Sequence, residues 1–263
     1  MPYINPLKKF GQNYLTDPNI LRKIVEEISP SNDDNIIEIG PGLGALTGLL
    51  LEKIPTITAI EIDTRVAEML REKYKGINLI TGDFLKTDLN KLYNSSENKL
   101  RILGNIPYNL TSPILFRIIE NNSIINDSVL MMQLEVAQRI TSKKGTKEYG
   151  ILAVLMNYFC DIKFCFKVSP NVFNPRPKVW SAVLHFYLKD ISPTDSEKRT
   201  FIQTVKAAFG NRRKTLKNSL SNSIFKEINF ENSGIDLSLR AEQLDIDDFV
   251  ILSKFIQSNS KTI

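Results

Sequence analysis

The sequence predicts an α/β fold in which an open parallel sheet is followed by a small helical domain. Short apolar strands alternate with helices through most of the chain, and the pattern changes to helices alone near Ile191-Ser192-Pro193. Four residues stand at the ends of successive predicted strands, and each is 22 residues after the one before it: Ile39, Glu61, Asp83 and Asn105. One strand and one helix per interval bring these positions to the same edge of a sheet, because crossovers between parallel strands are right-handed.

The composition sets limits on the kind of protein. The chain has 263 residues, 42% of them hydrophobic, and its 34 Lys and Arg against 29 Asp and Glu give a net charge of +5. With two cysteines and one histidine, a zinc site or a histidine-based triad is hard to build, so we expect no metal. His185 stands in an alternating apolar run and is expected to pack within a strand. No apolar run approaches the ~20 residues of a membrane span. The amino terminus lacks a signal-peptide core, so we expect a cytoplasmic protein.

The first elements are an arm and a helix. The residues through Leu15 show no periodicity and are expected to lie as an arm over the rest of the fold. Asp17-Pro18 is a typical helix start, with an N-cap and a proline in the first turn. Apolar residues follow at helical spacing: Ile20, Leu21, Ile24, Val25 and Ile28.

A glycine-rich turn comes next. The strand Asn35–Ile39 runs directly into Gly40-Pro41-Gly42-Leu43-Gly44, and a helix follows. Such a turn lets a ligand approach the backbone and presents amide groups at the helix start. Its spacing is G-x-G-x-G and not the G-x-G-x-x-G of the dinucleotide fingerprint, which favours S-adenosylmethionine over a nicotinamide cofactor.

Two acidic residues end the next two strands. Glu61 closes the strand from Thr56 to Ile62, where a carboxylate can accept from both ribose hydroxyls of a nucleoside. Asp83 follows the strand Ile77 to Thr81 and can accept from the adenine amine, with Phe84 beside it as an apolar wall. Either acid alone is expected to be a solvated turn residue, but the shared period favours a common site.

The turn at Asn105 suits a flat heterocycle that carries an exocyclic amine. It follows the apolar stretch Leu100 to Leu103, and Tyr108 can stack on a ring while the Asn105 side-chain oxygen accepts from the amine. Pro107 biases Ile106 to an extended backbone, which holds the Ile106 carbonyl as a second acceptor. The alternative is an ordinary strand followed by a turn.

Further elements complete the first domain. We expect a helix from Ser112-Pro113, a strand from Val129 to Leu134, a buried helix from Gly150 to Phe159 and two further strands, Ile162 to Val168 and Val179 to Leu188. The segment between the last two carries alternate prolines and is expected to be polyproline-like. Within it, Phe173 either faces Tyr108 across a base or packs into the core.

The helical part of the chain is rich in positive charge. Between Glu197 and Glu227 there is no acidic residue. The basic residues in that interval include Lys198, Arg199, Lys206, Arg212, Arg213, Lys214 and Lys217. A run of one sign with asparagines interspersed favours a surface that contacts phosphates over a merely solvated face. An amphipathic helix from Leu244 to Phe255 ends the pattern.

Five motifs together carry a resemblance to a known family. They are Phe10-Gly11-Gln12-Asn13-Tyr14-Leu15, Glu38 through Thr47, Asn105 through Tyr108, Phe173 through Val179 and Arg212 through Leu216. In this order they resemble the small-subunit ribosomal RNA adenine dimethyltransferases, the RsmA/KsgA family, over almost the whole chain. Tyr14 stands where Phe is usual in that family, and Ala241 where Pro is usual.

The resemblance implies a Rossmann-like class I methyltransferase sheet with a small C-terminal helical domain. Residues 1–190 are then the S-adenosylmethionine-binding catalytic domain and residues 191–263 the helical RNA-binding domain. The implied reaction dimethylates N6 of two adjacent adenosines in the hairpin loop near the 3′ end of small-subunit rRNA. The implied partner is a pre-ribosomal small subunit, and we expect a monomer.

The candidate site residues fall into three groups. The catalytic candidates are Asn105, Ile106, Pro107, Tyr108 and Phe173. The cofactor candidates are Asn13, Leu15, Gly40, Gly42, Gly44, Glu61, Asp83, Phe84 and Asn105. The RNA candidates are Arg176, Lys178, Arg212, Arg213, Lys214 and Lys217.

Three alternatives differ in substrate or in class. The related antibiotic-resistance methylases modify an adenosine in large-subunit RNA, but their glycine loop usually lacks the Pro41-Gly42-Leu43-Gly44 form. A non-catalytic RNA-binding assembly factor has no need to keep Asn105, Glu61 and Asp83. A DNA adenine methylase normally needs more chain for target recognition than the residues after the boundary provide.

Overall fold

The structure, a computed structural model, forms two compact units. It describes residues 5–7, 10–93 and 98–259. Unit 1 consists of Met1–Ala137 and Asp161–Lys189, and unit 2 of Gln138–Cys160 and Asp190–Ile263. The change of unit near residue 190 falls where the strands stop. We expected residues 138–160 in the first domain, but they belong to unit 2.

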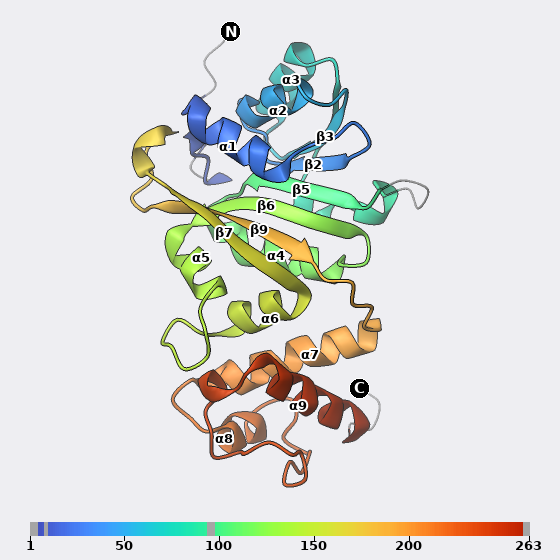
Figure 1. Cartoon of the computed structure of the whole chain (residues 1–263), viewed down its shortest axis with the longest axis vertical. Coiled ribbons are helices and arrows are strands. Elements are labelled where there is room, and N and C mark those ends of the chain that lie inside the picture. Colours follow the sequence, from blue (N-terminus) through green and yellow to red (C-terminus); the bar gives the residue numbers. More distant parts are fainter. Residues whose placement is uncertain (1–4, 8–9, 94–97, 260–263) are drawn as a thin grey trace. The chain divides into compact units, whose positions relative to one another are not determined.

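Unit 1 is built on a seven-stranded sheet whose order is β4-β3-β2-β5-β6-β9-β7 (Figure 1). The strands are β2 (Asn35–Ile39), β3 (Ile57–Glu61), β4 (Ile77–Thr81), β5 (Leu100–Asn105), β6 (Ile125–Gln133), β7 (Cys160–Val168) and β9 (Ser181–Leu188). The strands β4, β3, β2, β5 and β6 are parallel, and β9 is antiparallel to β6. The predicted α/β fold with a parallel sheet is confirmed.

Helices connect and cover these strands. They are α1 (Pro18–Ile28), α2 (Ala45–Leu51), α3 (Thr64–Lys73), α4 (Thr111–Glu120) and α5 (Leu134–Ile140), with 3-10 turns at Phe84–Lys86, Leu89–Lys91, Tyr108–Leu110 and Pro170–Val172. The Asp17 side chain caps α1, as predicted, by accepting from the backbone N–H groups of Asn19 and Ile20. Apolar residues of α1 and α2 pack against Leu103 of β5 and Val129 of β6. The neighbouring residues Ile102 and Leu130 are also fully buried, so both faces of the sheet are covered.

The amino-terminal arm is joined to a distant segment. Its strand β1 (Tyr14–Leu15) pairs with β8 (Phe173–Asn174) in a separate two-stranded sheet. The segment before β8 is a 3-10 turn, so residues 171–178 do not form the continuous polyproline-like chain that we expected. Backbone pairing with the arm takes the place of that extended, unpaired conformation.

A buried network of charges lies at the opposite end of the strands from Asn105. His185 contacts Asp127 at 2.8 Å through Nε2 and Glu27 at 2.9 Å through Nδ1. Arg101 donates to Asp127 and to Asp34. Burial works to raise the pKa of Asp127, but its bonds with Arg101 and His185 outweigh that and hold this pKa below its usual value. The expectation that His185 packs within a strand is confirmed.

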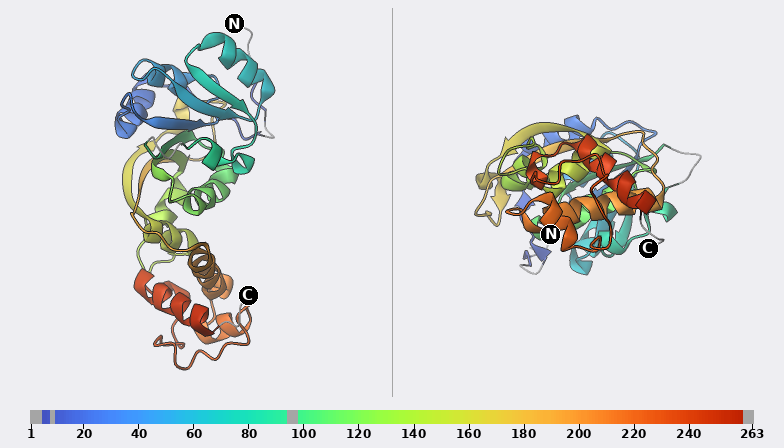
Figure 2. Two further views of the ribbon diagram at one scale, coloured as in Figure 1. Left: turned by 90° about the vertical axis from the view of Figure 1, so that its right-hand side faces the viewer. Right: turned by 90° about the horizontal axis from the view of Figure 1, so that it is seen from below.

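In the part of unit 2 that the structure describes, the regular elements are helices and 3-10 turns, apart from the first residue of β7. Its helices are α6 (Ile151–Phe159), α7 (Asp195–Ala208), α8 (Leu216–Ser221) and α9 (Ile246–Asn259), with 3-10 turns at Phe209–Asn211 and Ala241–Gln243. Thr194 and Glu197 form a capping box at the start of α7. The helices α7 and α9 lie side by side (Figures 1 and 2), and α6 packs on both. Aromatic rings fill the contact, with Phe209 stacked on Phe249.

Candidate active site

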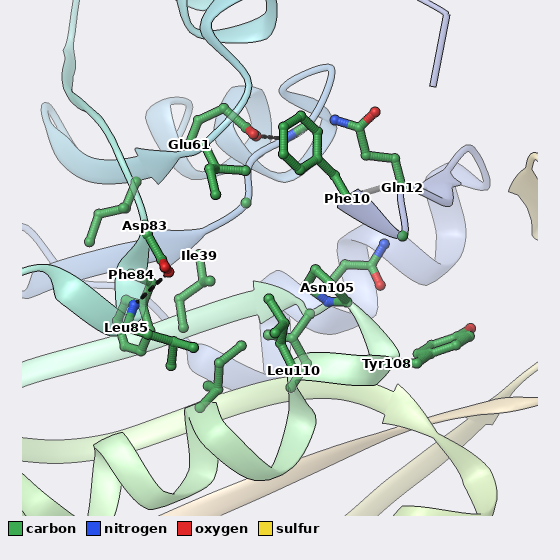
Figure 3. Close-up of a pocket in the computed structure, with 18 of the residues that line it drawn as sticks. Phe10, Gln12, Ile39, Glu61, Asp83, Phe84, Leu85, Asn105, Tyr108 and Leu110 are labelled. Carbon is green, nitrogen blue, oxygen red and sulfur yellow. Dashed lines mark hydrogen bonds between the residues drawn. The ribbon is translucent and has the colours of Figure 1, made fainter. Parts of the chain in front are cut away.

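The carboxyl ends of β2, β3, β4 and β5 open into one pocket (Figure 3). It is lined by Phe10, Gly11, Gln12, Asn13, Tyr14, Ile39, Gly40, Gly42, Ile60, Glu61, Ile62, Gly82, Asp83, Phe84, Leu85, Asn105, Ile106, Pro107, Tyr108, Leu110 and Ile114. Figure 3 shows Asp83 and Phe84 on one side, Tyr108 on the other and Asn105 between them. The residues that share the 22-residue interval therefore meet in space, as the strand spacing predicts.

The glycine loop leaves the pocket open next to the backbone. Gly40 has a φ of +62°, and apart from its two chain neighbours no residue has an atom within 4 Å of the place where a Cβ would stand. Gly42 has a φ of +55°, and a Cβ there would come within 2.9 Å of the Tyr14 ring. A side chain at Gly40 would fill the space offered to a ligand, and one at Gly42 would displace the arm.

Glu61 is a buried carboxylate at the end of β3, only 3% exposed. Its Oε2 accepts from the Gly42 backbone N–H at 3.2 Å, and its Oε1 accepts from that of Asp63 at 2.9 Å. Burial raises the pKa of Glu61, while these two backbone donors work against the rise. Glu61 is thereby fixed against the glycine loop, with acceptor capacity left on both oxygens for hydroxyl groups of a ligand.

A second buried carboxylate, Glu38, lies behind the loop. It is 1% exposed and accepts from the Thr47 hydroxyl at 2.6 Å. Burial, with a smaller contribution from the charge of Glu61, raises the pKa of Glu38 to about 7. Glu38 therefore holds its proton to a higher pH than an ordinary glutamate does.

Asp83 and Phe84 form the wall beyond β4. The Asp83 Oδ1 accepts from the Leu85 backbone N–H at 2.9 Å, which caps the 3-10 turn Phe84–Lys86. Phe84 is 5% exposed and supplies an apolar surface next to that carboxylate. Because Oδ1 is held by the turn, the orientation of Asp83 at the pocket is fixed before any ligand arrives.

The orientation of the Asn105 amide is set by the arm. Its Nδ2 donates to the Asn13 backbone carbonyl at 2.9 Å. The oxygen of the amide therefore remains as the group that can accept from a ligand in the pocket. Ile106 continues the turn and anchors it, because its N–H donates to the Met131 carbonyl at 3.2 Å.

Tyr108 is held at the edge of the pocket by β9. Its hydroxyl lies 2.7 Å from the Ser181 Oγ, and its backbone carbonyl accepts from the Thr111 hydroxyl at 3.1 Å. Burial raises the pKa of Tyr108 above its usual value, so the ring is a neutral phenol at physiological pH. A neutral ring held at both ends is a suitable surface for stacking on a base.

Three of the catalytic and cofactor candidates, Phe173, Leu15 and Gly44, do not line the pocket. Phe173 is 5% exposed and packs in the core with Leu15, its partner in the β1–β8 pair. Phe173 was expected either to face Tyr108 across a base or to pack into the core, and the structure shows the core position. Burial of its ring together with the Leu15 side chain removes both from water, which is favourable. Gly44 caps α2 with a φ of +79° beneath Tyr74.

The pocket also contains residues that the sequence did not single out. Gln12 accepts from the Leu7 N–H and donates to Asp63, which in turn pairs with Arg65. This chain of contacts fastens the arm to the loop after β3. Ile62, Leu85 and Leu110 add apolar lining. Gln12 belongs to the motif that carries the family resemblance, so a signal was present, whereas nothing in the sequence distinguishes the three apolar residues.

The predicted RNA-contacting residues have different surroundings. Arg176 and Lys178 are exposed in unit 1, and Arg213, Lys214 and Lys217 are exposed in unit 2. Arg212 differs, because its guanidinium donates to the carbonyls of Lys147 and Tyr149 and to Glu242. These contacts tie three segments of unit 2 together, so Arg212 has a structural role whatever else it contacts.

The pocket fits S-adenosylmethionine by its chemistry. A nucleoside requires acceptors for the ribose hydroxyls and the adenine amine, together with an apolar slot for the ring, and Glu61, Asp83 and Phe84 supply these. The open space at Gly40 accommodates a group close to the backbone. Among the described residues, no cluster of His, Cys, Asp and Glu is suited to a metal ion, and no helix is long and apolar enough to cross a membrane.

Comparison with known proteins gives one answer. Residues 5–258 match the model of the ribosomal RNA adenine dimethylase family. The chain is 50% identical, over 95% of its length and 89% of the relative, to ribosomal RNA small subunit methyltransferase A of Chlorobaculum parvum. It is 48% identical to the protein of that name from Chlorobium phaeobacteroides, over 94% of this chain and 92% of the relative.

Solved structures agree with this. A dimethyladenosine transferase from Plasmodium falciparum has a TM-score of 0.77 at 25% identity, covering 93% of this chain and 98% of that one. The 23S rRNA methyltransferase ErmE has a TM-score of 0.66 at 25% identity, covering 93% and 100%. The matched model, the close relatives and the pocket together show that the chain belongs to the ribosomal RNA adenine dimethylase family.

Proposed function

We propose that the protein dimethylates N6 of two adjacent adenosines in the hairpin loop near the 3′ end of small-subunit rRNA, with S-adenosylmethionine as the methyl donor. The observation that carries this proposal is the orientation of Asn105. Its side-chain nitrogen donates to the Asn13 carbonyl at 2.9 Å, so its side-chain oxygen is the atom that can accept from an exocyclic amine. An acceptor in that position suits an adenine and has no purpose in a protein that only binds RNA backbone.

The chemistry required of the chain is modest. The bound cofactor supplies an electrophilic methyl group. The adenine amine is a weak nucleophile, because its lone pair is delocalised into the ring. When Asn105 Oδ1 and the Ile106 carbonyl accept hydrogen bonds from its N–H groups, the nitrogen becomes more electron-rich and its lone pair is directed at the methyl group. Alignment of reactants is worth about 7–11 kcal/mol of barrier, so no strong general base is needed. The proton leaves to water after transfer, when the nitrogen has become acidic.

The target base must leave its stack to reach the pocket. Extrusion costs less for a loop adenosine than for a paired one, which fits a hairpin-loop substrate. Tyr108 offers a stacking surface for the extruded base, and its bond to Ser181 keeps that ring in place. The same surface serves each of the two adenosines in turn.

Exposed basic residues in both units are suited to contact with an RNA substrate. Exposed cations at Arg213, Lys214 and Lys217 in unit 2 and at Arg176 and Lys178 in unit 1 suit an RNA backbone. We infer that the substrate is a pre-ribosomal small subunit in the cytoplasm and that the enzyme acts as a monomer, coupled to assembly of that subunit.

The test is to incubate the protein with labelled S-adenosylmethionine and either unmethylated small subunits or large subunits. Label should enter only the small-subunit RNA, and mapping should locate two adjacent N6,N6-dimethyladenosines in the terminal hairpin loop. Label in large-subunit RNA would favour the antibiotic-resistance type of activity instead. Binding to subunits without any label transfer would favour an assembly factor.

A further inference from the structure

The only tryptophan of the chain, Trp180, is exposed one residue before Ser181, whose hydroxyl contacts Tyr108 of the pocket. Half of its surface is open to solvent, and its neighbour Val179 is 42% exposed. Large aromatic side chains dominate the energetics of burial, so an exposed one beside a site suggests a binding role. Nothing in the chemistry proposed above uses Trp180.

The backbone at Trp180 is fixed in position. Its carbonyl accepts from the Leu134 N–H at 2.9 Å, and the next residue, Ser181, opens β9. Ser181 is fully buried and holds the Tyr108 hydroxyl at 2.7 Å. Consecutive Cα atoms lie about 3.8 Å apart. Trp180 is therefore one residue away from the group that anchors the proposed base-stacking ring.

The segment that leads into Trp180 carries exposed positive charge, and one exposed acid, Glu135, follows the residue that bonds the Trp180 carbonyl. Between Asp161 and Asp190 there is no acidic residue, and Arg176 and Lys178 are both exposed just before Trp180. Cations interleaved with an aromatic ring are the pattern of single-stranded nucleic acid binding, in which the cations follow the phosphates and the ring takes a base. A protein partner of mixed charge would not require a segment of one sign.

We propose that Trp180 is a stacking site for the nucleotide next to the target adenosine, with Arg176 and Lys178 on the flanking phosphates. This rests on the proposed function. When the target adenosine is extruded, its neighbour loses a stacking partner. The Trp180 ring replaces that partner and sets how far the strand advances toward Tyr108. Trp180 is thus a positioning residue for the RNA and not a catalytic one.

Fluorescence offers a direct test, because Trp180 is the sole tryptophan. The full-length protein, saturated with S-adenosylhomocysteine, is titrated with an RNA hairpin that carries the two adjacent adenosines, and binding is followed separately by anisotropy of a dye on the RNA. We expect tryptophan emission to fall with the same midpoint as the anisotropy. A hairpin that is abasic at the neighbouring nucleotide should bind more weakly and leave the emission unchanged.

Kinetics with unmethylated small subunits provides the second test. Trp180→Leu should raise the half-saturating subunit concentration about tenfold, the scale of one stacking contact, with cofactor affinity unchanged. Trp180→Phe should recover most of the loss. The matched control is Tyr187→Leu, which removes a 43% exposed ring from the far end of the same strand and should leave the half-saturating concentration as it is.

Two results would overturn the inference. The first is tryptophan emission that is not quenched although the anisotropy shows that RNA is bound. If the hairpin alone does not bind, the equivalent result is a Trp180→Leu variant with an unchanged half-saturating subunit concentration. The other is a parent dimer that Trp180→Leu converts to a monomer, which would assign the ring to a contact between copies. If the parent protein methylates no subunit at all, the proposed function fails first, and the two failures are thereby distinguished.

Discussion

The side-chain nitrogen of Asn105 donates to the backbone carbonyl of Asn13 at 2.9 Å, across 92 residues of sequence. The arm at the start of the chain thereby decides which end of the Asn105 amide faces the ligand. The arm is held in turn by Gln12, which donates to Asp63, and by the pairing of β1 with β8. The reactive turn and the arm consequently act as one preorganised group.

Asn105→Ala should lower turnover by about 10²-fold or more, because it removes a polar group fixed in place before the reaction. RNA affinity should survive, since Tyr108 and the exposed cations remain. The measurement is single-turnover methylation at saturating cofactor, because the loss of the bond to Asn13 also disturbs the cofactor pocket. Asn109→Ala, at an exposed asparagine four residues further on, is the control. Methylation by Asn105→Ala at the parent rate would leave the Ile106 carbonyl as the only acceptor.

Glu61→Ala and Asp83→Ala should each weaken binding of the cofactor by about 1–3 kcal/mol, the usual cost of removing a partner from a buried hydrogen bond. Glu61→Ala should also lower stability, because it leaves the Gly42 and Asp63 N–H groups without their acceptor. Titration calorimetry with S-adenosylhomocysteine measures the first effect and denaturant unfolding the second. Unchanged affinity in both variants would remove these carboxylates from the cofactor site.

Glu38 should make stability depend on pH. Its pKa rises from an ordinary value of 4.5 to about 7 on folding, so between these values the folded chain binds more protons than the unfolded chain. The stabilisation is then complete below about pH 4.5 and is lost as the pH rises through 7. Glu38→Gln, which keeps an acceptor for Thr47, should therefore raise the free energy of unfolding at pH 8.5 by up to about 3 kcal/mol and change it little at pH 5.

Urea unfolding at the two pH values provides the measurement for Glu38. Glu52→Gln, at an exposed carboxylate just after α2, should shift stability equally at both. An equal shift in the Glu38 variant as well would mean that this carboxyl titrates normally in the folded chain.

The RNA surface of unit 2 is best tested at Arg213 and Lys214, since Arg212 is occupied by the carbonyls of Lys147 and Tyr149. Changing both to Gln should reduce the salt slope of RNA binding by about 2, at about one unit per phosphate contact, and leave cofactor binding alone. The control changes Lys53 and Lys75, exposed residues that precede β3 and β4 at the other end of those strands. An equal effect of the two pairs would indicate attraction by net charge alone.

Asp127→Asn should destabilise unit 1 by about 3 kcal/mol, the lower end of the range for breaking a buried ion pair. The lower end applies because Arg101 keeps its bond to Asp34 at 2.6 Å. Chemical denaturation measures the loss, and Asp161→Asn, at a 79% exposed partner of Lys189, should cost almost nothing. A similar small cost at Asp127 would mean that the network contributes little net stability.

The sequence predicted the parallel sheet and the convergence of four strand ends, because both follow from local periodicity and from chain direction. Glu61, Asp83 and Asn105 were found on that basis, and all three line the pocket. Their assigned roles remain predictions until binding and turnover are measured.

Residues whose surroundings depend on distant segments were not predictable. Phe173 is buried because it pairs with Leu15, and no local pattern links these two positions. Arg212 looked like any other member of a basic run, although its two carbonyl acceptors lie 63 and 65 residues away. His185 was expected to pack, but its two carboxylate partners come from α1 and β6. Each of these cases depends on a contact between segments that only the folded chain brings together.

The shared direction of the parallel strands has a practical consequence for attaching probes. A strand of five residues such as β3 spans roughly 16 Å, so a dye fixed just before β3 sits that far from the ligand pocket. Lys53 is exposed there, while the native cysteines are buried at Cys160 and half-buried at Cys165. A thiol introduced at position 53 therefore provides a handle for immobilisation or for energy-transfer measurements that leaves the working edge of the sheet uncovered.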